Sequence, residues 1–165
     1  MRLSWLGSDG ASHLGAAIDA SGSIDELARV GVLYERLPLD GYQEALERLK
    51  ATRGYVTQDI VELRPEMPNL RAVCDKFKAE HLHRDDEVRF VLEGEGIFDI
   101  RAADGRWMRV AVEAGDLIVV PADLYHRFFL TDRQQIRCVR LFKDAAGWVP
   151  EYRVTTSTVS SAPSV

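Results

Sequence analysis

The hydrophobic pattern changes character at about residue 81. From there on, apolar and polar residues alternate with a period of two, in short runs separated by turn residues. The sequence Asp104-Gly105 between two of these runs is a strong hairpin signal. Several short strands at regular spacing favour an antiparallel sandwich or barrel. The predicted strands cover residues 88–92, 96–102, 106–112, 117–120, 126–131 and 136–142.

The first 80 residues mix helical and extended patterns. Ser23 followed three residues later by Glu26 predicts the start of a short helix. Apolar residues at helical spacing after Asp40 predict a second helix that ends near Gly54. The fold class that we expect is therefore mainly β with N-terminal helices (α+β). A third helix is predicted over residues 69–77, and strands are predicted over residues 30–35 and 56–63.

The length of 165 residues predicts a single domain. We expect this domain to cover residues 1–154, with an α/β N-terminal extension over about residues 1–80 and a barrel core over about residues 81–154. The tail, residues 155–165, is rich in Ser and Thr and nearly uncharged, and we expect it to be disordered. His13 lies in a stretch rich in Gly, Ser and Ala, and we assign it no function.

Composition and charge exclude several classes of protein. Hydrophobic residues make up 46% and charged residues 28%, as in ordinary soluble proteins, and the net charge of −5 disfavours nucleic-acid binding. Cys74 and Cys138 form no C-x-x-C pair, so we interpret them as reduced thiols. Asp9 lies where a signal peptide would need an uninterrupted run of apolar residues. No stretch approaches the roughly 18 apolar residues of a membrane span. We expect a cytoplasmic monomer.

Three of the four histidines and one glutamate form a candidate metal site. Alternate residues of a strand share a face, so His81-x-His83 presents two imidazoles side by side. Glu87 follows four residues later, and His126 lies 39 residues beyond it. This donor set suits Fe(II), Ni(II), Mn(II), Co(II) or Zn(II). Four-coordinate zinc would form a closed structural site, whereas a six-coordinate ion keeps two positions for a chelating substrate.

Two arginines and an aspartate lie close to these residues in the sequence. Arg89 shares a strand face with Glu87, and it binds either an anionic ligand or a carboxylate such as Glu87 or Asp86. Arg140 lies in an apolar run and needs either a carboxylate or a substrate as its partner. Asp86 is adjacent to Glu87 and is a candidate to orient Arg89 or a ligand histidine.

Three aromatic residues are candidates for the wall of the site. Phe128 shares a strand face with His126, Phe77 precedes the histidine pair, and Trp148 follows the last long strand. Ordinary core packing is the alternative role for each, and it is the more common one for buried phenylalanines.

The metal motifs resemble those of the cupins, which are small double-sheet barrels with a metal inside. His81-x-His83-x3-Glu87-x6-Gly94 resembles the first cupin motif, and Gly115-x5-Pro121-x4-His126 resembles the second. The second motif usually has Gly where this chain has Asp123, and often Asn where it has Leu130. Longer blocks resemble the acireductone dioxygenase family, over about residues 25–152. These blocks are residues 80–90, 94–96, 116–121, 140–142 and 147–148.

The resemblance implies a cupin-type double-stranded β-barrel (jelly roll) with one Fe(II) or Ni(II) per chain, held by His81, His83, Glu87 and His126. It implies an enzyme of methionine salvage that acts on acireductone, an enediol with a methylthio tail, together with O2. Iron would give the 2-oxo acid precursor of methionine and formate. Nickel would give methylthiopropanoate, formate and carbon monoxide. The resemblance implies catalytic roles for Arg89 and Glu87, and substrate contacts for Arg89, Arg140, Phe77, Phe128 and Trp148.

Other functions are compatible with the same ligand set. One is a cupin isomerase or a different cupin dioxygenase, although thiol dioxygenases of this fold typically lack a counterpart of Glu87, and sugar-phosphate isomerases would need more basic residues. Another is a metal-binding or ligand-sensing cupin without turnover. Bound zinc with no exchangeable water would favour that non-catalytic form.

Overall fold

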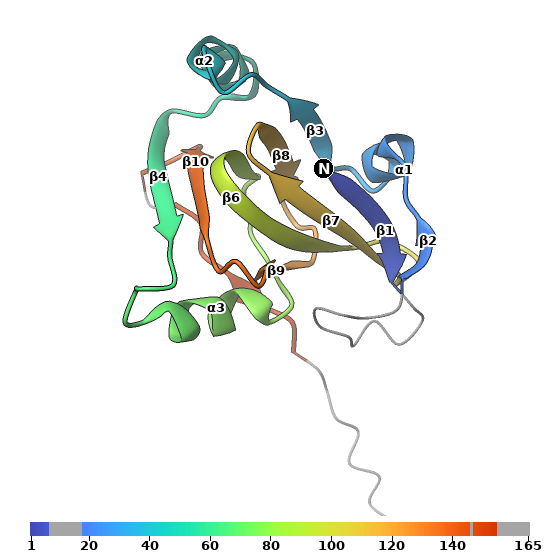
Figure 1. Ribbon diagram of the computed structural model, residues 1–165. Helices are drawn as coiled ribbons and strands as arrows, with labels where there is room; N and C mark the ends of the chain where they lie inside the picture. The colour runs from blue at the N-terminus through green and yellow to red at the C-terminus, as the bar shows by residue number, and fades with distance from the viewer. Residues whose placement is uncertain (7–17, 146, 155–165) are drawn as a thin grey trace, which may run out of the picture.

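The structure, a computed structural model, describes residues 1–6, 18–145 and 147–154. It is mostly β, with three helices in these ranges (Figure 1). The predictions for His13 and for residues 155–165 concern residues outside this description. The helices are α1 (Ile24–Arg29), α2 (Tyr42–Arg53) and α3 (Leu70–Lys78). The strands are β1 (Arg2–Leu6), β2 (Ile18–Ser21), β3 (Leu33–Arg36), β4 (Thr57–Leu63), β5 (His81–Leu82), β6 (Glu87–Arg101), β7 (Trp107–Glu113), β8 (Asp116–Val120), β9 (His126–Leu130), β10 (Ile136–Phe142) and β11 (Glu151–Tyr152).

Strand β6 connects the two halves of the sheet arrangement. Its first half pairs with β8 and β10, and its second half pairs with β7 and β9. The prediction of two separate strands over residues 88–92 and 96–102 was wrong, because β6 is continuous over 15 residues. Gly94 lies inside it with φ of 76°, and a Cβ atom there would lie 2.1 Å from the carbonyl oxygen of Gln135. Glycine therefore allows the strand to pass from one set of partners to the other.

Strands from the first 80 residues extend the sheets built by the later ones. All three pairings are antiparallel: β1 with β7, β3 with β8, and β4 with β10. The sequence pattern missed β1 and β2, because it assigned no structure to residues 1–22. The division into an extension and a barrel core stays a prediction.

The helix boundaries follow from local sequence signals. The Ser23 hydroxyl accepts a hydrogen bond from the Glu26 backbone, and the Glu26 carboxylate accepts one from the Ser23 backbone, which confirms the predicted cap of α1. Helix α2 ends at Gly54, whose φ of 77° is the left-handed conformation expected of a C-cap glycine. The longest described helix, α2, has 12 residues, and none of the described helices could cross a membrane.

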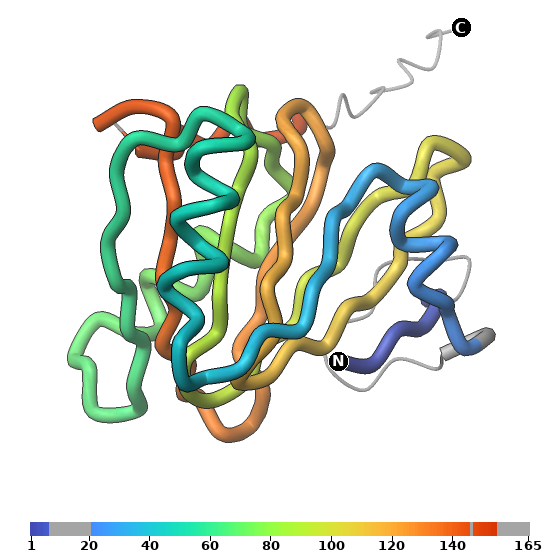
Figure 2. The backbone as a smooth tube through the Cα atoms, turned by 90° about the horizontal axis from the view of Figure 1, so that it is seen from above, coloured from blue at the N-terminus to red at the C-terminus, as the bar shows by residue number. Residues whose placement is uncertain are grey.

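The core consists of two clusters separated by the sheet. Strand β8 is buried throughout, because its alternate residues face different clusters. Ile118 lies in the larger cluster with Phe98, whereas Leu117 lies in the smaller one with Leu46 of α2 and Phe90. Figure 2 shows α2 lying across the outer side of β6 and β10, where it covers the smaller cluster. Burial of each such side chain contributes about 1.5–3 kcal/mol.

Candidate metal centre

The four predicted ligands converge from three strands and one loop. His81 lies on β5, Glu87 begins β6, His126 begins β9, and His83 lies in the loop between β5 and β6. Their ligand atoms all lie within 4.8 Å of one another. Each of the four residues is 7% exposed or less. The structure thus brings together the complete set that the sequence predicted.

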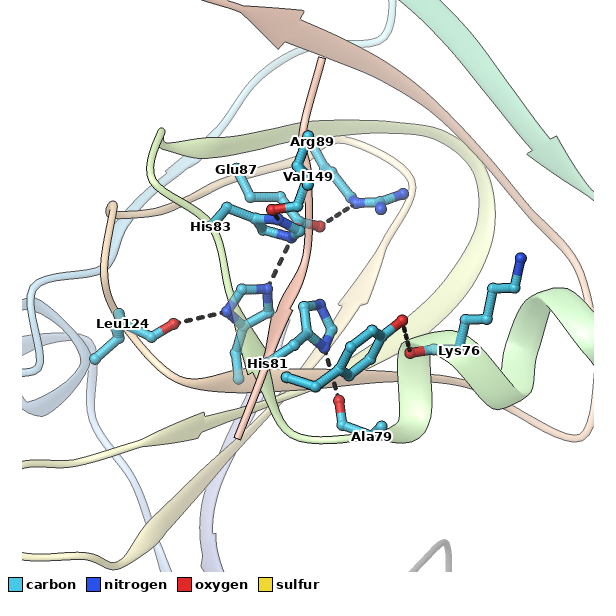
Figure 3. Close-up of polar contacts among 10 residues, drawn as sticks. Lys76, Ala79, His81, His83, Glu87, Arg89, Leu124 and Val149 are labelled. Atoms are coloured by element: carbon cyan, nitrogen blue, oxygen red, sulfur yellow. Dashed lines mark hydrogen bonds and ion pairs between the residues drawn. The ribbon is translucent and has the colours of Figure 1, made fainter. Parts of the chain in front are cut away.

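Backbone carbonyl groups orient all three imidazole rings. In each ring the Nδ1 atom is within hydrogen-bond distance of a carbonyl oxygen, so Nδ1–H donates and Nε2 is the nitrogen left for a metal (Figure 3). Such second contacts typically fix the tautomer of metal-binding histidines. The three pairs are His81 with Ala79 (2.7 Å), His83 with Val149 (3.1 Å) and His126 with Leu124 (2.8 Å).

Glu87 is the shared anion of the cluster. Its Oε2 atom lies 3.0 Å from Nε2 of His83 and 3.0 Å from Nε2 of His126, and its Oε1 atom accepts a hydrogen bond of 2.6 Å from Nε of Arg89. Burial raises the pKa of Glu87, but the charge of Arg89 and the hydrogen bonds from the two histidines outweigh it and hold the pKa well below its usual range. The carboxylate is therefore ionised and available as a ligand.

The histidines differ in their protonation. Burial lowers the pKa of His81 to about 4, so this ring is neutral near pH 7. Burial also lowers the pKa of His83, but the hydrogen bond and charge of Glu87 outweigh burial and raise it above its usual value. Neutral imidazole is the form that binds metals, so a metal would displace any proton held between His83 and Glu87.

The donor set fits a divalent transition-metal ion. Three imidazole nitrogens and one carboxylate are borderline ligands of the kind preferred by such ions. Metal–ligand bonds of about 2.0–2.2 Å would separate opposite ligands by about 4.0–4.4 Å, and the ligand atoms of this cluster all lie within 4.8 Å of one another. Small shifts of the side chains would therefore complete a coordination sphere.

A cavity of about 130 Å³ opens beside the cluster. The predicted substrate residues Phe77, Arg89, Arg140 and Trp148 line it, together with His81, His83 and Glu87. Arg89 is 3% exposed, and its guanidinium lies over aromatic rings in addition to contacting Glu87. The ring centroids lie 5.8 Å away for Phe77, 5.4 Å for Phe128 and 5.3 Å for Trp148.

Phe128 lies behind Arg89, in the core. It is 3% exposed and packs against Phe98 and, edge-on, against Phe77. A Cβ atom on Gly96 would lie 2.6 Å from its ring, so the strand approaches Phe128 closely. Phe128 thus packs in the core and is not among the residues that line the cavity, and its role as a wall of the substrate site stays a prediction.

Arg140 has a carboxylate partner as well as a place on the cavity. Its Nε atom donates a hydrogen bond of 2.8 Å to Asp59 of β4, and a second nitrogen contacts the other oxygen of Asp59. Arg140 lies directly opposite Arg89 on the neighbouring strand β6. Like charges in that position repel, so each arginine needs its own carboxylate.

Asp86 does not contact the residues that the sequence suggested. Its oxygens accept hydrogen bonds from the Tyr55 hydroxyl (2.7 Å), from Arg53 (3.2 Å) and from the backbone N–H of Ala122 (3.1 Å). The expected contact with Arg89 or a ligand histidine was therefore wrong. Adjacent residues of an extended chain face opposite sides, so Asp86 points away from the side that Glu87 faces. It ties the end of α2 and the loop before β9 to the start of β6.

Sequence reasoning missed several residues around the site. Lys76, Pro150 and Tyr152 line the cavity, and the Tyr152 ring lies 5.9 Å from that of His81. The Val149 carbonyl orients His83, a contact that leaves no trace in side-chain patterns. Only Lys76 could have been suspected from the sequence, because it is adjacent to the predicted cavity residue Phe77.

Asp123, which departs from the cupin motif, lies in a conformation that favours glycine. Its φ is 64°, and its backbone N–H donates a hydrogen bond of 2.8 Å to the His83 carbonyl. Aspartate is among the non-glycine residues that adopt this left-handed region most readily. The departure therefore preserves the loop that leads to His126.

A buried cluster of three histidines and a glutamate within a mostly β fold defines a metal-binding protein of the cupin type. Comparison with known proteins gives the particular family. Residues 12–150 match the ARD/ARD' family, and the chain belongs to it.

The similarity to individual relatives is extensive. The chain is 49% identical over 128 residues to an acireductone dioxygenase of Heterostelium pallidum, a match that covers 78% of this chain and 88% of the relative. It is 38% identical over 133 residues to the acireductone dioxygenase of Rattus norvegicus, covering 79% of this chain and 74% of the relative. A solved acireductone dioxygenase from Bacillus anthracis, with a cadmium ion in its active centre, has a TM-score of 0.77 and 32% identity, covering 92% of this chain and 97% of the other.

Proposed function

We propose that this chain is an acireductone dioxygenase, which cleaves 1,2-dihydroxy-3-oxo-5-(methylthio)pent-1-ene with O2. The observation that carries the proposal is the buried contact of Glu87 with His83, His126 and Arg89 beside an open cavity. This arrangement offers both a metal site and a cationic group for an enediolate. Family membership agrees with it.

The metal ligands in this proposal are His81, His83, Glu87 and His126, and the ion is Fe(II) or Ni(II). When bound by these four residues, the ion would supply Lewis-acidic or redox chemistry to a substrate that chelates it through neighbouring oxygens. The products are expected to depend on the metal. Iron gives 4-methylthio-2-oxobutanoate and formate, and nickel gives 3-methylthiopropanoate, formate and carbon monoxide.

Arg89 binds and orients the enediolate in this proposal. A guanidinium has five N–H donors, and Glu87 accepts a hydrogen bond from one of them. The remaining donors are available to substrate oxygens. Because Arg89 is buried, its charge is strengthened by the low dielectric of the site.

The aromatic residues shape the rest of the substrate site. Phe77 and Trp148 form apolar walls for the methylthio tail, since sulfur contacts with rings are favourable. Phe128 supports Arg89 from behind. The Nε1 atom of Trp148 is buried and has no hydrogen-bond partner among the described residues, and we assign it as a donor to a substrate oxygen. Arg140 completes the cavity wall while held by Asp59.

The proposal extends to the architecture around the site. Residues 1–154 form one domain whose strands close into the double-stranded cupin barrel, and the protein acts as a cytoplasmic monomer. Asp86 acts at a distance from the ion, by holding the segment before Glu87 in place through Tyr55 and Ala122. The match to the Bacillus anthracis structure over 92% of this chain supports the single domain.

A paired reconstitution tests the function. The protein is stripped of metal, one sample is loaded with Fe(II) without oxygen and another with Ni(II), and both receive acireductone and O2. We expect metal-dependent loss of the enediol absorbance, with the oxo acid from the iron sample and carbon monoxide from the nickel sample. Stoichiometric metal binding with only background decay of acireductone would refute the assignment while leaving the metal site intact.

The charge of Glu87 has its own test. Glu87→Gln keeps the size of the side chain but removes the anion that His83, His126 and Arg89 share. We expect lower metal content and lower turnover. Full metal content and full turnover in this variant would contradict the role given to its charge.

A further inference from the structure

Three cationic side chains line the cavity beside the metal ligands, and they differ in how their charge is balanced. Arg89 is paired with Glu87 at 2.6 Å. Arg140 is paired with Asp59 through two hydrogen bonds, one of 2.8 Å. Lys76 lines the same cavity, and in the part of the chain that the structure describes it forms no ion pair.

Lys76 lies where the cavity meets solvent. It belongs to the last turn of α3, next to Phe77, and its side chain is exposed. Figure 3 shows this side chain leaving α3 on the side of the site where the Arg89 guanidinium lies. The Tyr152 hydroxyl donates a hydrogen bond of 3.4 Å to the Lys76 carbonyl. Because the Tyr152 ring also packs against His81, this bond links the last turn of α3 to the metal ligands.

The charge balance makes an anion the natural partner of Lys76. The chain as a whole carries −5, which repels an anionic ligand. A cation at the mouth of a cavity reverses that potential locally and raises the local concentration of anions. Arg89 and Arg140 each contact a carboxylate, so Lys76 is the cation of this cavity whose charge no carboxylate balances among the described residues.

If the charge of Lys76 served only to stabilise α3, Lys78 in the same turn would serve equally well. Cations in the last turn of a helix stabilise its negative end, and both Lys76 and Lys78 lie there. Lys78 is paired with Asp75 at 3.5 Å and does not line this cavity. Lys78 is therefore a matched control, on the same turn and with the same charge.

We propose that Lys76 is the recognition cation of the cavity mouth, selecting the anionic enediolate form of the substrate. This inference rests on the proposed function and names a specificity residue for it. The ammonium contacts the anion before and during the reaction alike. The ammonium stabilises the bound substrate and the transition state equally. Removing it is therefore expected to raise KM and to leave kcat unchanged.

Kinetics of three variants test the inference. Lys76→Met removes the charge and keeps the length of the side chain, Lys76→Arg keeps the charge, and Lys78→Met is the control. We expect Lys76→Met to raise KM by about 3- to 5-fold, the upper part of the range of an exposed ion pair, with kcat unchanged. The dependence of kcat/KM on ionic strength should weaken in the same variant. Lys76→Arg and Lys78→Met should behave as the wild type.

A binding measurement gives a readout that does not depend on turnover. Ascorbate, an enediolate anion, is titrated calorimetrically without oxygen into the Ni(II)-loaded protein, and Lys76→Met should bind it about 3- to 5-fold more weakly. Equal KM, equal ascorbate affinity and equal salt dependence in Lys76→Met and wild type would overturn the inference. Lys76-dependent ascorbate binding without turnover of acireductone would support it while refuting the proposed function.

Discussion

Strand β6 carries two buried carboxylates, one at each end, and they have different partners. Glu87 is 3% exposed and Asp99 is fully buried. Each contacts an arginine, Arg89 for Glu87 and Arg109 for Asp99, at 2.6 and 2.8 Å. The Asp99 oxygens also accept hydrogen bonds of 2.9 Å from a second nitrogen of Arg109 and of 3.0 Å from Arg127. The Glu87 carboxylate instead contacts two imidazoles.

The difference shows what distinguishes a metal site from a structural ion cluster. Guanidinium groups keep their protons, so the contacts of Asp99 are permanent and satisfy both of its oxygens. An imidazole nitrogen can bind a metal in place of a proton, so the contacts of Glu87 with His83 and His126 can be exchanged for bonds to a metal. A buried acid–arginine pair alone therefore does not indicate function.

The largest expected effect comes from the end with the histidines. His126→Ala removes one ligand, and we expect metal affinity and kcat/KM to fall by more than about 100-fold, because losing an outer partner of a ligand alone costs about 10- to 100-fold. Metal content by mass spectrometry and turnover by product analysis measure this. A variant that keeps its metal and its activity would show that the two ends of β6 do not differ as described.

Removing the charge at the other end should affect stability instead. Asp99→Asn removes the charge of a carboxylate that two largely buried guanidinium groups contact, and we expect the free energy of unfolding to fall by about 3 kcal/mol. Urea denaturation measures the change, with Asp104→Asn as the control, since Asp104 is 52% exposed and pairs with Arg106 at the surface. Folded Asp99→Asn protein should bind metal in full stoichiometry. Loss of metal in this variant would contradict the purely structural role given to Asp99.

Metal loading should stabilise the protein through the Glu87 end. A metal at about 100 times its Kd adds about 2.7 kcal/mol, which corresponds to a rise of about 5–10 °C in Tm for a chain of this size. Scanning calorimetry with and without Ni(II) checks this. His126→Ala should show little or no rise, and an equal rise in that variant would place the metal elsewhere.

The smallest effect concerns the support of Glu87 by its neighbour. Tyr55→Phe removes the hydrogen bond to Asp86, and we expect a loss of about 1 kcal/mol in unfolding free energy and a decrease in metal affinity of less than about 10-fold. Tyr34→Phe is a matched control, because the Tyr34 hydroxyl donates a similar bond to Asp116 outside the metal centre. Equal metal affinities in the two variants would exclude a supporting role for Tyr55.

Local patterns were sufficient for the ligand set and for several element boundaries. His81, His83, Glu87 and His126 were predicted together from the ligand chemistry and spacing of these residue types, although His83 lies in a loop and not on the strand expected for the His-x-His pair. The α1 cap and the end of α2 at Gly54 follow from contacts within a few residues. Such signals depend only on residues close together in the sequence, so they can be recognised without knowledge of the fold.

Long-range pairing decided the rest. Whether Arg140 meets a carboxylate depended on β4 lying beside β10, which brings Asp59 opposite it. The partners of Asp86 come from the end of α2 and from the loop before β9. Lys76 has no ion-pair partner among the described residues, and it lines the same cavity as Arg89 and Arg140 only because α3, β6 and β10 meet there. The sequence by itself determined which groups can bind a metal. Tertiary structure decided which charges are already satisfied, because that depends on neighbours far away along the chain.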